Sequence, residues 1–61
     1  MKRRQLLKHL KQHGCELLRE GGSHSVFWNP ENRQAGTVPR HTEILNKLSR
    51  KICKDLAIPR I

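Results

Sequence analysis

The sequence predicts an α+β fold in which a helix, three short strands and a second helix follow one another along 61 residues. Apolar residues recur with helical spacing near both ends of the chain, and glycine, asparagine and proline divide the middle into short runs rich in strand formers. Short turns between consecutive strands favour an antiparallel meander. Two amphipathic helices then cover one face of the sheet, which makes two layers around one core and leaves the other face open.

The first helix is predicted over residues 3–13, because Leu6, Leu7 and Leu10 form a narrow apolar stripe. Gly14 follows at the position where glycine commonly ends a helix, since it takes a left-handed conformation without a steric penalty. Basic residues occupy most of the remaining helix surface: Lys2, Arg3, Arg4, Lys8 and Lys11. The sequence therefore predicts one buried stripe and a positively charged outer surface.

Three strands are predicted between the helices, over residues 15–20, over residues 24–28, and from Arg33 or Gln34 to Val38. The first turn is Gly21-Gly22-Ser23, where the glycines allow positive φ angles. The second turn lies at residues 29–32, which read Asn-Pro-Glu-Asn, and Pro39 closes the third strand. Gly36 inside the third strand is typical of a β-bulge.

Alternation along the second predicted strand divides its side chains between the two faces of the sheet. His24, Val26 and Trp28 share one face, and Ser25 and Phe27 share the other. Because both faces carry apolar residues, the sequence leaves open which of them meets the helices. Trp28 either stacks on a nucleotide base or lies in the core or at its rim, and a lone tryptophan in so small a domain favours the core or rim.

The second helix is predicted from apolar residues at helical spacing: Ile44, Leu45, Leu48, Ile52 and Leu56. Thr42 and Asn46 are both suitable N-cap residues, and we favour Asn46, so that Ile44 and Leu45 lead into the helix. Pro59 is expected to end it. The outer face is again basic, with Lys47, Arg50, Lys51 and Lys54.

Thirteen Lys and Arg against five Asp and Glu give a net charge of +8 and an isoelectric point of about 10.6. This charge density predicts a polyanionic partner, either nucleic acid or an acidic protein. A membrane surface ranks last, because the charge is spread over the chain rather than gathered on one amphipathic helix. No stretch approaches the roughly 18 apolar residues of a membrane span, and the basic N-terminus lacks the apolar run of a signal peptide. We therefore expect a single cytoplasmic domain over residues 1–61.

The chain offers few groups for metal or cofactor chemistry. Cys15 and Cys53 lack Cys-x-x-Cys spacing, so both are expected to be free thiols that act as small apolar residues. His9 and His13 lie four residues apart on one helical face, a spacing that can bind a metal ion. No carboxylate or third ligand accompanies them, so we expect two exposed polar residues, no metal site and no cofactor.

His24 follows the glycine turn at once and stands where a loop becomes a strand, a fixed position with open access. RNA cleavage needs a base that takes the proton of the 2′-hydroxyl and a cation that steadies the charge on the phosphate. An imidazole exchanges protons near neutral pH, and basic side chains or the amides of a glycine turn hold phosphate. His41 is the candidate for a second acid or base, although phosphate contacts explain Arg40 and His41 equally well.

The chain resembles the HicA toxins, small ribonucleases of bacterial HicA–HicB toxin–antitoxin pairs. The resemblance covers nearly the whole chain and depends on the order and spacing of its motifs: Gly14 after a basic helix, Gly21-Gly22-Ser23-His24, Asn29-Pro30, Thr37-Val38-Pro39-Arg40-His41 and Cys53-Lys54-Asp55-Leu56-Ala57-Ile58. It implies an αβββα fold similar to a double-stranded-RNA-binding domain. It also implies cleavage of messenger RNA without a metal ion, His24 as the essential residue, and neutralisation by a HicB-type antitoxin.

We therefore predict a toxin that acts as a metal-independent endoribonuclease with His24 as the catalytic acid or base. The predicted RNA contacts are Gly22, Ser23, Arg40, His41, Lys47, Arg50 and Lys54. Phosphate contacts carry no base identity, so binding is expected to be largely independent of RNA sequence. The alternative is a non-catalytic module that recognises the shape of double-stranded RNA. A DNA-binding regulator is a weaker third class, because three strands separate the helices that a helix-turn-helix unit needs side by side.

Overall fold

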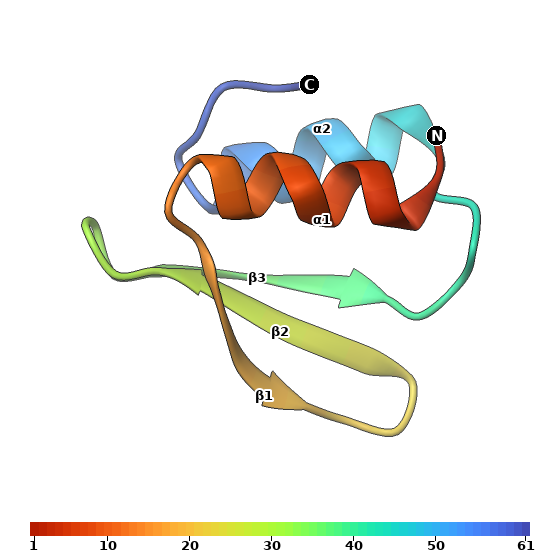
Figure 1. Cartoon of the computed structure of the whole chain (residues 1–61), viewed down its shortest axis with the longest axis horizontal. Helices are drawn as coiled ribbons and strands as arrows, with labels where there is room; N and C mark the ends of the chain where they lie inside the picture. Colours follow the sequence, from red (N-terminus) through yellow and green to blue (C-terminus); the bar gives the residue numbers. More distant parts are fainter.

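A computed structural model describes residues 1–61, and the elements follow one another in the predicted order (Figure 1). The bounds are α1 Arg3–Gln12, β1 Glu16–Glu20, β2 His24–Asn29, β3 Gln34–Pro39 and α2 Asn46–Asp55. The strands form one antiparallel sheet in the order β1-β2-β3. Both helices lie on the same side of this sheet (Figure 1), so the prediction of a two-layer α+β fold is confirmed.

The core lies between the helices and one face of the sheet. Its nine buried apolar residues are Leu6, Leu10, Cys15, Phe27, Val38, Ile44, Ile52, Cys53 and Leu56. Along β2, Ser25, Phe27 and Asn29 are buried, whereas His24 is exposed and Trp28 is half-buried. The face that carries Phe27 therefore meets the helices, and the face that carries His24 stays open. This settles the question that alternation alone left undecided, and it places Trp28 outside the core.

β1 extends away from the helices at the edge of the sheet (Figure 1). None of its residues is buried, and Leu17 and Leu18 are 49% and 56% exposed. The register with β2 shifts between Leu17 and Arg19, so the irregularity of the sheet lies in this edge strand. A bulge at an edge twists the strand and interrupts the row of unpaired backbone groups that another chain could pair with.

Gly36 does not form the expected bulge. It is buried and pairs in regular register with Phe27. A Cβ atom at this position would lie 3.3 Å from Leu56 Cγ and 3.6 Å from the carbonyl oxygen of Ile52. Glycine is therefore favoured here because α2 packs closely on β3, which is a contact between distant parts of the chain.

The C-terminal end of α1 confirms one prediction and corrects another. Gly14 follows the C-cap residue His13 with a φ of 82°, as predicted for a helix-ending glycine. His9 is not a free surface residue, because its Nε2 lies 2.6 Å from the carbonyl oxygen of Pro59. The rings of His9 and His13 meet edge to face, with centroids 4.6 Å apart. No three His, Cys, Asp or Glu side chains are grouped in a way that could hold a metal ion.

The prediction that Asn46 caps α2 is wrong. Leu45 is the N-cap residue, no side chain caps the helix there, and Asn46 is the first helical residue. Pro59 does not end the helix either. α2 ends at Asp55, and Ala57 turns the chain away with a φ of 55°. The C-terminal end of α2 is closed by backbone hydrogen bonds, from the amide of Ala57 to the carbonyl of Lys54 and from the amide of Ile58 to the carbonyl of Cys53, both 3.0 Å long.

The beginning of α1 is tied to the segment that precedes α2. The amide of Arg3 donates a 2.8 Å hydrogen bond to the carbonyl of Thr42, and Lys2 and Glu43 form an isolated antiparallel bridge. The Lys2 ammonium lies 3.0 Å from the Glu43 carboxylate, and this hydrogen bond and its charge lower the pKa of Glu43. These contacts hold Lys2 and Arg3 beside the connector between β3 and α2.

Cys15 and Cys53 are both buried and form no disulfide. Burial raises the pKa of both thiols, and the charge of Cys53 raises the pKa of Cys15 further. A raised pKa keeps a thiol protonated and unreactive near neutral pH. The prediction that both cysteines act as small apolar residues is confirmed.

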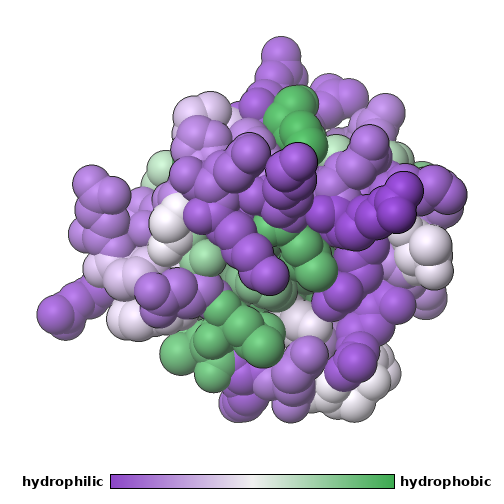
Figure 2. Space-filling model, in the orientation of Figure 1, coloured by the Kyte–Doolittle hydropathy of each residue, from purple (hydrophilic) through white to green (hydrophobic).

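The surface of the molecule is dominated by polar and charged groups. Figure 2 shows a largely hydrophilic face that is interrupted by small apolar areas. Neither helix has the length and the apolar run that a membrane crossing requires.

Candidate active site

The turn between β1 and β2 holds the start of β2 in place. The amide of Gly21 donates a 2.7 Å hydrogen bond to the carbonyl oxygen of His24. A Cβ atom on Gly21 would lie 3.1 Å from that same oxygen, so glycine is favoured here for space. Neither Gly21 nor Gly22 has a positive φ, which corrects the expectation that the pair supplies left-handed backbone. The turn depends instead on the close approach at Gly21.

His24 is the first residue of β2 and lies opposite Pro39 of β3 in the sheet register. It is exposed, and alternation along β2 places its side chain on the open face, because Ser25 next to it is buried toward the helices. The imidazole is therefore accessible to a large substrate, while the backbone that carries it is paired on both sides by the sheet and the turn.

Arg40 brings a positive charge to the same corner. Its amide lies 3.3 Å from the carbonyl oxygen of Ser23, and its guanidinium Nη1 donates a 3.3 Å hydrogen bond to the carbonyl of Gly21. The same Nη1 lies 3.5 Å from Glu20 Oε1. The guanidinium group is therefore bonded to the turn that leads into His24.

Gly22 and His41 are also exposed at this corner. No heavy atom lies within 4 Å of the place where a Gly22 Cβ would be, so this part of the turn is open. His41 lies two residues beyond Pro39, the register partner of His24, and so at the same end of the sheet. The structure thus brings one group of the predicted site residues to a single corner: Gly22, Ser23, His24, Arg40 and His41. We refer to these residues as the His24 corner.

The three predicted contacts on α2 lie elsewhere. Lys47, Arg50 and Lys54 are exposed, whereas Ser49 and Ile52 of the same helix are buried. Both helices cover one face of the sheet, and His24 lies on the other face (Figure 1). Because the buried side of α2 faces the sheet, its basic side points away from the His24 corner. The structure does not bring these three residues together with His24.

Arg3 was predicted to lie on the outer surface of its helix, but it reaches behind the turn. Its Nη2 donates a 2.9 Å hydrogen bond to Ser25 Oγ, and its Nε donates a 2.9 Å hydrogen bond to the carbonyl of Pro39. Ser25 Oγ in turn donates a 2.5 Å hydrogen bond to Glu20 Oε1. Arg3 lies three residues before the buried Leu6, and residues with this spacing share one face of a helix. This spacing was the signal in the sequence that could have predicted an inward-facing Arg3.

Glu20 connects the two arginines of the site. Its Oε1 accepts a hydrogen bond from Ser25, which is bonded to Arg3, and the same oxygen lies 3.5 Å from Arg40 Nη1. Hydrogen bonds to ionised groups are roughly twice as strong as those between neutral groups. One network therefore joins α1, the end of β1, the start of β2 and the end of β3 behind the exposed imidazole.

Replacing Ser25 with alanine is expected to lower the free energy of unfolding by about 1–3 kcal/mol, because Arg3 and Glu20 lose a buried partner. Urea unfolding followed by circular dichroism measures the change. Ser23→Ala is the matched control, since Ser23 is exposed and contributes its backbone carbonyl, and its effect is expected to stay within about 0.5 kcal/mol. Equal stability of Ser25→Ala and the wild type would contradict the proposed network.

Comparison with known families agrees with the resemblance found in the sequence. A family model described as HicA toxin of bacterial toxin-antitoxin matches residues 3–58, which is most of the chain. The chain therefore belongs to the HicA toxin family. HicA toxins cleave messenger RNA, so membership supports an endoribonuclease toxin in general terms. No curated protein and no solved structure matches the chain.

Proposed function

We propose that this chain is the toxin of a HicA–HicB pair and that it cleaves messenger RNA without a metal ion, with His24 as the catalytic acid or base. The observation that carries the proposal is an exposed imidazole at the start of β2, beside a turn fixed by backbone hydrogen bonds, with the guanidinium of Arg40 bonded to that turn. Membership of the HicA family supports the substrate class. The chain acts as one cytoplasmic domain over residues 1–61.

The proposed reaction balances with these groups. The imidazole of His24 takes the proton of a 2′-hydroxyl, and the oxygen attacks the adjacent phosphorus. The bond from phosphorus to the 5′-oxygen then breaks and that oxygen takes a proton, so the products carry a 2′,3′-cyclic phosphate and a 5′-hydroxyl. A positioned acid or base contributes about 10²–10⁴-fold to the rate. A guanidinium such as that of Arg40 stabilises the charge that develops on the phosphate, and His41 is the candidate for the second proton transfer.

RNA is held mainly through its phosphates in this proposal. The contacts at the corner are Gly22, Ser23, Arg40 and His41, and the contacts on α2 are Lys47, Arg50 and Lys54. Because the α2 residues lie on the far side of the sheet from His24, they hold a more distant part of the RNA. Contacts to phosphate do not distinguish bases, so the grip is independent of sequence.

The proposed partner is a HicB-type antitoxin that covers the His24 corner. Acidic groups on the antitoxin complement the net charge of +8. Direct cover is the simplest mode of neutralisation, because His24 and Arg40 are exposed and a protein bound over them excludes RNA from the corner.

A second candidate function is binding of double-stranded RNA without cleavage. The observation in its favour is the exposed basic side of α2, formed by Lys47, Arg50 and Lys54, which lies apart from His24. Proteins of this kind recognise the shape of a duplex through phosphate and 2′-hydroxyl contacts. Cleavage of a single-stranded RNA separates the two candidates.

Purified protein mixed with a single-stranded RNA and excess chelator is expected to release fragments with 2′,3′-cyclic phosphate and 5′-hydroxyl ends. The control is the same sequence with 2′-O-methyl groups, which lacks the attacking hydroxyl and is expected to stay intact. Activity that disappears in chelator and returns with a metal ion would contradict the metal-independent mechanism. Duplex binding without any cleavage would favour the second candidate.

A further inference from the structure

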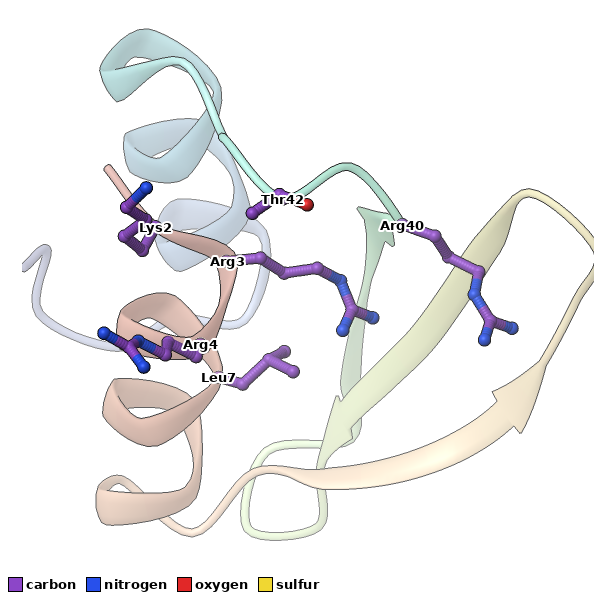
Figure 3. Close-up of a pocket in the computed structure, with 6 residues that line it drawn as sticks. All are labelled: Lys2, Arg3, Arg4, Leu7, Arg40 and Thr42. Carbon is purple, nitrogen blue, oxygen red and sulfur yellow. The ribbon is translucent and has the colours of Figure 1, made fainter.

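A hollow of about 540 Å³ lies beside the His24 corner, between the start of α1 and the connector that follows β3 (Figure 3). Its lining consists of Lys2, Arg3, Arg4, Leu7, Arg40 and Thr42. Four of these six residues are basic and none is acidic. Ligand pockets in proteins are commonly about 300–1,000 Å³, so the hollow has room for a nucleotide unit rather than for a lone ion only. We refer to it as the basic hollow.

The charges in the basic hollow are only partly neutralised within the chain. Lys2 pairs with Glu43 at 3.0 Å, and Arg40 pairs with Glu20 at a longer 3.5 Å. Arg4 is exposed and forms no ion pair. The positive charge that remains favours an anionic ligand, and a bound phosphate could replace the long contact between Arg40 and Glu20.

The basic hollow and the His24 corner share their positioning groups. Arg40 lines the hollow while its amide and guanidinium bond to the turn before His24. Arg3 also lines the hollow, and its guanidinium is fixed by Ser25, the residue after His24. Figure 3 shows Arg3 extending from α1 toward the sheet and Arg40 extending from the end of β3, so the two guanidinium groups stand on either side of the strand end.

We propose that the basic hollow binds a backbone phosphate of the RNA next to the phosphate that is cleaved at His24. The RNA strand passes from the open face of the sheet, where the imidazole lies, around the end of β3 to the start of α1. Arg4 and Lys2 supply exposed charge, Arg3 is held in place by its hydrogen bonds, and Leu7 gives the one apolar wall against which a sugar can lie. The identity of the strand as substrate depends on the proposed function, whereas the anion site does not.

Arg4→Ala tests the basic hollow in the intact chain. Arg4 is an exposed helical residue without an ion pair, and alanine is the best helix former, so the fold is expected to survive. The probe is a fluorescent, single-stranded 2′-O-methyl RNA that cannot be cleaved, with affinity measured by anisotropy at several salt concentrations. The salt slope is the slope of the logarithm of the affinity against the logarithm of the salt concentration. Loss of one phosphate contact is expected to reduce its size by about 0.7. At 0.1 M salt this corresponds to roughly a fivefold loss of affinity, relative to the effect at about 1 M.

Arg33→Asn is the matched control, because it also removes one exposed positive charge. Arg33 lies in the turn between β2 and β3, at the end of the sheet opposite to His24, and asparagine tolerates its φ of 60°. Affinity and salt slope are expected to stay close to those of the wild type. If both variants weaken binding equally, or if neither does, the basic hollow is not a discrete phosphate site and the proposal is overturned.

The position of the bound phosphate is tested with RNAs that carry one neutral methylphosphonate at successive positions. In the wild type, one substitution next to the mapped cleavage site is expected to weaken binding about fivefold. In Arg4→Ala that substitution is expected to add no further loss, because its partner is already gone. If the methylphosphonate and the Arg4→Ala substitution reduce affinity independently at every position of the RNA, the proposal is overturned. If the wild type cuts no RNA at all, the proposed function fails, while the anisotropy data still report whether the hollow holds a phosphate.

Discussion

His24→Ala is expected to lower RNA cleavage by about 10²–10⁴-fold and to relieve growth arrest when the toxin is expressed. The exposed side chain contributes little packing, so the fold and most of the RNA affinity are expected to survive. Cleavage rates, circular dichroism and RNA titrations on the same preparation measure the effects on activity, fold and binding.

His13→Ala is the matched control for this experiment. His13 is an exposed histidine at the C-terminal end of α1, whereas Arg3 at the N-terminal end is the residue that reaches the His24 corner. This variant is expected to cut RNA at the wild-type rate. A folded His24→Ala protein that still cuts at the wild-type rate would rule out the mechanism and make His41 the next residue to test. Loss of fold, binding and cleavage together would show instead that His24 is structural.

Leu56→Ala is expected to lower the free energy of unfolding by about 2–5 kcal/mol. Leu56 is fully buried and its side chain packs against Gly36 of β3. Its carbonyl still accepts the hydrogen bonds of Asn29 and Asn32, so the loss comes from the apolar side chain alone. A chain of 61 residues has roughly 3–9 kcal/mol of stability in total, so the variant is expected to lose a large share of its stability. Thermal and urea unfolding measure the change.

Leu45→Ala removes the same atoms from the other end of α2. Leu45 is 76% exposed at the N-cap, so its truncation is expected to change stability by less than about 0.5 kcal/mol. Similar losses in the two variants would show that α2 does not dock on β3 through Leu56. The comparison therefore separates burial from the chemical identity of the side chain.

The sequence by itself determined the elements and the place of the candidate catalytic residue. The spacing of Leu6 and Leu10 predicts α1, Gly14 ends it with a positive φ, and the glycine turn places His24 at the first residue of a strand. Each of these features depends on residues within a few positions of one another, so local steric preference and hydrophobic periodicity are sufficient to predict them. The motifs of the HicA family are likewise defined by their order along the chain, which does not depend on contacts between distant residues.

Only the tertiary structure decided what depends on contacts between distant residues. It showed that Phe27 rather than His24 faces the helices, and that Gly36 is small because α2 lies on it rather than because a bulge forms. It also showed that Arg3, which was predicted to lie on the outer surface of the helix, donates a hydrogen bond to Ser25. The local sequence pattern determines which conformations of a segment are favoured. Which face of a strand is buried, and which hydrogen-bond partner a side chain finds, is set by the free energy of packing segments that lie far apart in the chain. The basic hollow belongs to this second group, because the start of α1 and the connector that follows β3 form it only when they meet.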